Sequence, residues 1–106
     1  ANTAQRLTGQ GASPGQVHGQ ARLAVDALQL PDLAPGAILV AENIGPLWTP
    51  IFPRLGGLVL EGGAVSQHAA ATAREYGIPA VVTVKDARRR IPDGAWITVD
   101  GTMGIV

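Results

Sequence analysis

The sequence predicts an α/β domain, and three features of its 106 residues lead to that prediction. Short, continuously apolar runs at 38–41, 57–60 and 80–82 are typical of buried strands. An alanine-rich segment with helical spacing lies between the last two runs. Fourteen glycines and eight prolines indicate many turns between short elements. Two β–loop–α–β arrangements of this kind favour the α/β class.

The first half of the chain begins with a polar segment, residues 1–6, that we expect to be loose. A turn at Ser13-Pro14-Gly15 precedes residues 16–25, where apolar and polar side chains alternate as in a half-buried strand. The apolar run at 38–41 is the next strand. Residues 47–55 follow a proline and are predicted to form a short helix.

The second half predicts one longer helix between two strands. After the strand at 57–60, this helix runs over about 67–76. Gly77 is a natural C-terminal cap, and Pro79 prevents the helix from continuing. The chain then returns as the strand at 80–82.

The last part of the chain predicts a polar connection and a closing hairpin. Residues 86–91 form the connection, and the three arginines at 88–90 are interpreted as a solvated run. Residues 96–99 alternate as a strand does, and Asp100-Gly101 makes a hairpin turn. We expect 104–106 to close the sheet.

Composition narrows the class of protein. The length fits one domain, and eight basic residues balance eight acidic ones, so no basic face for nucleic acid is expected. The chain has no cysteine, no apolar run of membrane-spanning length and no signal-peptide pattern, so we expect a cytoplasmic protein with no membrane partner. Asp86, Asp93 and Asp100 are interpreted as turn residues, and their spacing predicts no metal site.

His68 is the candidate catalytic residue. It follows a glycine-containing loop at the start of the predicted helix, where free N–H groups and the helix dipole favour phosphate. Its neutral imidazole is a nucleophile at about pH 7 and can take a phosphoryl group covalently. The loop residues expected around that phosphate are Gly62, Gly63, Ala64, Ser66 and Gln67.

Residues 61–82 resemble the phosphohistidine motif of the phosphoenolpyruvate-utilising enzymes, which reads roughly Gly-Gly-x-Thr-Ser-His-Ala-Ala-x-x-Ala-Arg-Glu-x-Gly-Ile-Pro-Ala-Val. That family includes phosphoenolpyruvate synthase, pyruvate phosphate dikinase and rifampin phosphotransferase. The segments 9–19, 35–40, 46–50, 93–94 and 99–101 resemble other parts of the same domain, in the same order. The resemblance therefore covers nearly the whole chain.

The resemblance implies a swivelling β/β/α phosphohistidine domain over residues 1–106. In this family, a histidine such as His68 accepts a phosphoryl group from an ATP- or phosphoenolpyruvate-utilising domain. It then passes the group to an acceptor such as pyruvate or an antibiotic. ATP and Mg²⁺ are expected on partner domains, with no cofactor bound by this domain. The chain limits match those of the family domain, so we expect an excised domain or a subunit rather than a complete enzyme.

Several positions depart from the family pattern, and Gly45-Pro46-Leu47-Trp48 lacks both aspartates of the corresponding family segment. Ala64 replaces the second glycine of the usual pair, and Gln67 precedes the histidine where serine or cysteine is usual. Thr83 stands where the family often has glycine. Ser66 keeps a hydroxyl that either caps the helix or contacts the phosphate. In some family members the hydroxyl at this place is phosphorylated to switch the enzyme off, so Ser66 is also a candidate regulatory residue.

Two other functions stay open at this point. One is a non-catalytic interaction or regulatory module with the same fold. The other is a carrier that passes phosphate from protein to protein in a sugar phosphotransferase chain.

Overall fold

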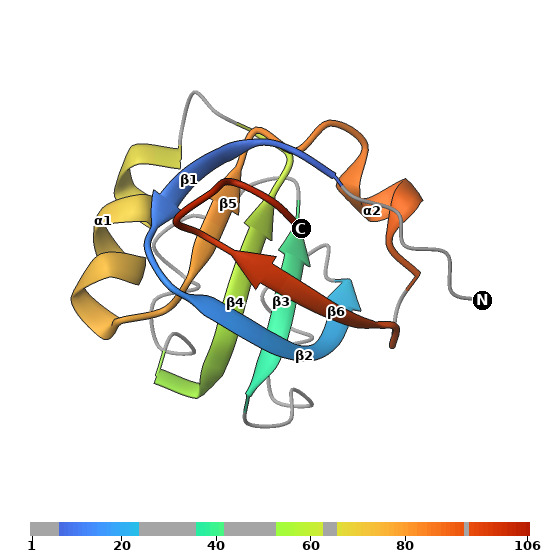
Figure 1. Ribbon diagram of the computed structural model, residues 1–106, viewed down its shortest axis with the longest axis horizontal. Coiled ribbons are helices and arrows are strands. Elements are labelled where there is room, and N and C mark those ends of the chain that lie inside the picture. Colours follow the sequence, from blue (N-terminus) through green and yellow to red (C-terminus); the bar gives the residue numbers. More distant parts are fainter. Residues whose placement is uncertain (1–6, 24–35, 42–52, 63–65, 93) are drawn as a thin grey trace.

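The computed structural model describes residues 7–23, 36–41, 53–62, 66–92 and 94–106, and for 66–69 the course of the backbone alone. These residues form six strands and two helices (Figure 1). In chain order the elements are β1 (Gln10–Ser13), β2 (Gln16–Leu23), β3 (Ala37–Ala41), β4 (Leu55–Leu60), α1 (Ser66–Tyr76), β5 (Ala80–Val82), α2 (Ala87–Arg90) and β6 (Trp96–Asp100).

The strands form one mixed sheet in the order β1-β5-β4-β3-β2-β6. The four central strands, β5, β4, β3 and β2, run parallel to one another, whereas the edge strands β1 and β6 pair antiparallel with β5 and β2. The carboxyl ends of β3, β4 and β5 therefore lie at one end of the sheet. Both helices begin at this end (top in Figure 1). The predicted α/β class is confirmed.

Strands β3, β4 and β5 contain only apolar residues and glycine because the sheet is covered on both faces there, whereas β2 alternates polar and apolar side chains. Alternate residues of β3 enter different cores: Leu39 packs in the same cluster as Ala73 of α1, while Ile38 and Val40 pack with Ala87 of α2. All five of these side chains are buried. A strand whose two faces are both buried is expected to be a continuous apolar run, without the alternation of polar and apolar residues seen in a half-buried strand.

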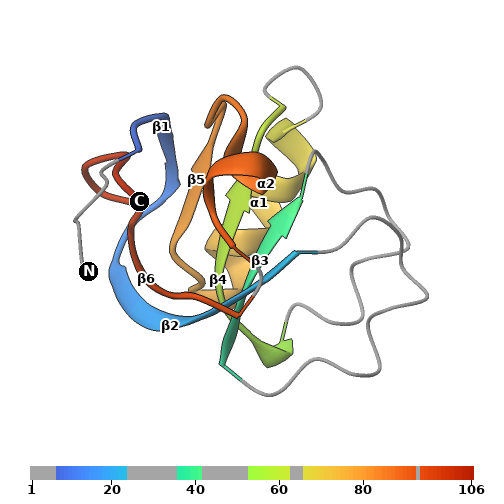
Figure 2. The ribbon, with the colours of Figure 1, turned by 90° about the vertical axis from the view of Figure 1, so that its right-hand side faces the viewer.

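The C-terminal segment closes the sheet against the N-terminal part of the chain. Leu7 and Val106 exchange two backbone hydrogen bonds, of 3.1 and 2.9 Å, and Thr8 forms a bridge with Ile105. The predicted closing role is confirmed, although 104–106 form isolated bridges and turns instead of a strand. Figure 2 shows the C-terminal segment beside β1.

Several predicted boundaries can be compared with the structure. Leu55 belongs to β4, so the predicted helix over 47–55 is wrong at its end; residues 47–52 lie outside the described residues, as does the polar segment 1–6. The edge strand β1 was not predicted.

No helix in the described part of the chain is long and apolar enough to cross a membrane.

The connection at 86–91 contains the short helix α2, which was not predicted. Ile91 N–H donates to the Ala87 carbonyl at 2.9 Å, and both side chains are buried. Ala87 and Ile91 are four positions apart, which is helical spacing, but the three polar arginines between them led to the prediction of a connection without a helix.

Candidate functional site

His68 is the third residue of α1, the helix that follows β4. The predicted helix over about 67–76 is confirmed, with one further residue, Ser66, at its start. The first N–H groups of a helix lack intrahelical acceptors, and its dipole is positive there. The backbone therefore places position 68 in an environment that favours an anion, at the end of the sheet where the parallel strands finish.

The far end of α1 is anchored to the core. Gly77 adopts the left-handed conformation with φ 69°, and its N–H donates to the Arg74 carbonyl at 3.3 Å. Ile78 N–H donates to the Ala73 carbonyl at 2.9 Å, which completes a Schellman cap. Ala73 and Ile78 are both buried. The predicted glycine cap is confirmed, and α1 is held as a rigid part of the domain.

The segment just before the loop is held by neighbours on two sides. Glu61 N–H donates to the Ala41 carbonyl of β3 at 3.0 Å, and Gly62 accepts a hydrogen bond of 3.2 Å from Thr83 N–H. On this side, Val84 N–H also donates to the Leu60 carbonyl at 3.0 Å. Gly62, a predicted phosphate-loop residue, therefore lies directly beside the chain that leaves β5.

Glu61 makes a further contact that sequence reasoning missed. Its carboxylate oxygen Oε2 accepts hydrogen bonds from Arg88 N–H at 2.7 Å and from Arg88 Nε at 3.3 Å. The Glu61 side chain is 17% exposed and the Arg88 side chain 33% exposed, so solvent partly screens this ion pair. Asp86, at the N-cap of α2, makes no side-chain capping bond, and Glu61, the residue that follows β4, supplies that acceptor instead. The interpretation of Arg88 as merely solvated is wrong.

Thr83 has a positive φ of 59°. Glycine adopts this left-handed conformation freely, whereas a β-branched residue is strained in it. The backbone conformation therefore explains why glycine suits this position. The strained residue is also the one whose N–H holds Gly62.

The predicted site residues are brought together only in part within the described residues. Gly62 ends the described part of the loop, while Ser66, Gln67 and His68 share the first turn of α1. Gly63 and Ala64 lie outside the described residues, as do the side chains of 66–69. Among the described residues, no group of three or more His, Cys, Asp or Glu side chains could hold a metal ion. The roles assigned to these loop residues stay predictions.

Comparison with known proteins identifies the family. Residues 33–104 match the model of the mobile domain of PEP-utilising enzymes. The chain belongs to this family. The mobile domain is 47% identical over 100 residues to a rifampicin phosphotransferase of Streptomyces sviceus, covering 94% of the chain and 11% of that protein. It is 38% identical over 100 residues to a probable phosphoenolpyruvate synthase of Pyrococcus abyssi, covering 94% of the chain and 12% of that protein.

The fold of the mobile domain agrees with that identification. A solution structure of Enzyme I superposes with a TM-score of 0.65 at 28% identity, covering 73% of this chain and 32% of the other. The expected phosphohistidine-domain fold is confirmed. The chain spans only 11% and 12% of the length of the two curated relatives named above, and 3% of a chondramide synthase of Chondromyces crocatus to which it is 42% identical over 105 residues, 99% of the chain. In those proteins the matching domain is thus one part of a much larger chain.

Proposed function

We propose that this mobile domain carries a phosphoryl group on His68. The donor is an ATP- or phosphoenolpyruvate-utilising domain, and the acceptor is a small molecule such as pyruvate or an antibiotic. The observation that supports this proposal is the position of His68 in the first turn of α1, after the loop that Gly62 begins. Family membership supports the same role, because the relatives include a phosphotransferase and a probable phosphoenolpyruvate synthase.

The transfer has two half-reactions. In the first, a ring nitrogen of His68 forms a bond to phosphorus while the bond from phosphorus to the donor oxygen breaks. In the second, an acceptor oxygen bonds to phosphorus, the N–P bond breaks and the imidazole is regenerated. Dividing one difficult transfer in this way is the advantage of covalent catalysis. ATP and Mg²⁺ are bound by the partner domain, and the start of α1 favours the charge of the phosphoryl group.

The carrier role also requires that the histidine move with its domain as one body. The Schellman cap at Gly77 and the buried Ala73 hold α1 to the sheet, and the Glu61–Arg88 contact holds the strand end that precedes the loop. A rigid domain that swings between two sites presents the same histidine to each site, and the orientation of the ring within the domain is kept.

Labelling tests this proposal directly. The chain is incubated with its cognate ATP-binding domain and ATP that is radiolabelled at the β or the γ phosphate. We expect an acid-labile, alkali-stable label that His68→Ala abolishes. The matched control is His18→Ala, because His18 is the other histidine of the chain and lies exposed on β2. Undiminished labelling of His68→Ala would contradict the proposal.

A further inference from the structure

The positive charge of this chain is concentrated in one short segment. Lys85, Arg88, Arg89 and Arg90 are four of its eight basic residues, and Asp86 is the acidic residue among them. Four positive charges and one negative charge give this segment +3. Because the whole chain has a net charge of zero, the remaining residues sum to −3. The segment is therefore a positive region on a domain that is otherwise negative.

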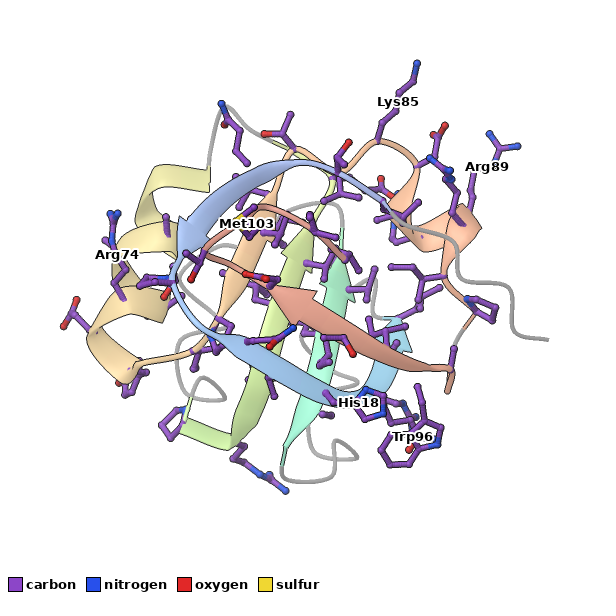
Figure 3. All side chains as sticks on the ribbon, in the orientation of Figure 1. His18, Arg74, Lys85, Arg89, Trp96 and Met103 are labelled. Atoms are coloured by element: carbon purple, nitrogen blue, oxygen red, sulfur yellow. The ribbon has the colours of Figure 1, made fainter. Side chains whose placement is uncertain are left out.

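This segment lies at the same end of the sheet as the start of α1. The hydrogen bonds from Thr83 to Gly62 and from Arg88 to Glu61 place it directly beside the strand end that leads to His68. Figure 3 shows Lys85 and Arg89 extending outward at that end of the domain, whereas Arg74 projects from α1 on another side.

Three of the four cations are available to a partner. Lys85, Arg89 and Arg90 are exposed, whereas Arg88 is engaged by Glu61. Within the described part of the chain, neither Lys85 nor Arg89 has an ion-pair partner. Their backbone is held in place because Ala87 and Ile91 are buried in the core. The charges are therefore presented from a fixed position.

We propose that Lys85, Arg89 and Arg90 form a cationic docking surface for the nucleotide-binding site of the phosphoryl-donor domain. The partner chemistry is the polyphosphate of the bound nucleotide, together with the entrance of its site. The inference rests on the proposed function: if His68 takes its phosphoryl group from ATP, this end of the domain must approach the nucleotide phosphates. Those phosphates are anionic, and complementary charge at the approaching surface raises the rate of productive encounter.

The test compares charge reversals in the 106-residue chain. Arg89→Glu and the double variant Lys85→Glu/Arg89→Glu are mixed with the ATP-loaded donor domain, and the second-order rate constant of His68 labelling is measured over a range of salt concentrations. At low salt we expect the double variant to be slower by about tenfold to a hundredfold. Its labelling rate should also fall less with added salt than that of the parent chain, because screening acts on the charges that were removed.

Two controls separate docking from other effects. Arg54→Glu makes the same charge change as Arg89→Glu at the residue just before β4, at the opposite end of that strand from Gly62, and should label at close to the parent rate. Phosphoramidate, a small chemical donor that needs no docking surface, should label His68 equally in all variants. Melting temperatures verify that each variant is folded.

The outcomes distinguish this inference from the proposed function. Parent-like labelling of the double variant at low salt would overturn the docking surface. Equal slowing with phosphoramidate would also overturn it, because the effect would then lie in the histidine itself. If the parent chain itself is not labelled on His68 by the donor domain and ATP, the proposed function fails and this inference fails with it.

Discussion

Thr83 shows at the scale of one residue how a departure from the family pattern is accommodated. Its backbone is left-handed, and its N–H nevertheless donates to Gly62. Asp86 has a similar φ of 58°, but aspartate tolerates this conformation better than a β-branched residue does. The strain at Thr83 is therefore the larger of the two.

Replacing Thr83 by glycine should stabilise the domain. Relief of the left-handed strain is worth about 1–3 kcal/mol, and the extra freedom of glycine in the unfolded chain offsets about 0.4–1 kcal/mol of that. We expect a net gain of about 1 kcal/mol in the free energy of unfolding, measured by urea denaturation. Thr83→Ala is the control, because it removes the branch but keeps the Cβ, and it should gain less. A lower unfolding free energy for Thr83→Gly would contradict the strain argument.

Ser66 provides a second prediction at this scale. Ser66→Ala should slow phosphoryl transfer and cost about 1 kcal/mol of helix capping. Ser66→Asp should slow transfer much more, because a fixed negative charge two residues from His68 repels the phosphoryl donor. The fold should survive, since acidic residues are favourable at helix starts. Transfer rates and melting temperatures of the two variants are compared; transfer by Ser66→Asp at the parent rate would show that the loop does not surround the phosphate.

At the scale of elements, β4 and α2 are joined by Glu61. This carboxylate lies at the start of α2, where an anion and an acceptor are both favourable. A short helix of four residues depends on such contacts, because its own hydrogen bonds are few.

Glu61→Ala should destabilise the domain by about 1–2 kcal/mol, because the N–H of Arg88 loses this acceptor. Glu61→Gln keeps an acceptor oxygen but not the charge, so its loss should be smaller. Urea denaturation of both variants measures the difference. If the two substitutions cost the same, the charge rather than the hydrogen bond holds α2.

At the scale of the whole molecule, the domain supplies a nucleophile and a rigid body to carry it. The two cores on the faces of the sheet give that body its stability. Under the proposed function, donor and acceptor are bound elsewhere, as the small share of each relative that this domain covers would suggest.

The isolated chain should therefore turn over nothing. With ATP and pyruvate but without a partner domain, we expect no pyruvate-dependent product above the rate of a His68→Ala sample. Product formation is followed by a coupled assay for phosphoenolpyruvate. Steady turnover by the purified chain, lost in His68→Ala, would contradict the carrier role and assign a complete site to this domain.

Strands β3, β4 and β5, the helix α1 with its Gly77 cap, and the candidate role of His68 could all be predicted from the sequence alone. These depend on local rules: apolar runs for strands covered on both faces, helical spacing, a glycine that can turn left-handed, and a motif contained in one segment. The role of His68 stays a prediction, because the side chains of 66–69 lie outside the described residues.

The contacts between segments that are distant in the sequence could be identified only in the folded chain. The pairing of β1 with β5, the bridge between Thr8 and Ile105, and the Glu61–Arg88 contact join residues far apart in the chain. No local pattern encodes such contacts, since each depends on where the whole sheet places its ends. The basic segment 85–90 is the clearest example. Its composition indicated only a solvated surface, whereas the contacts of Thr83 with Gly62 and of Arg88 with Glu61 place Lys85, Arg89 and Arg90 at the end of the sheet where α1 begins, as a candidate docking surface.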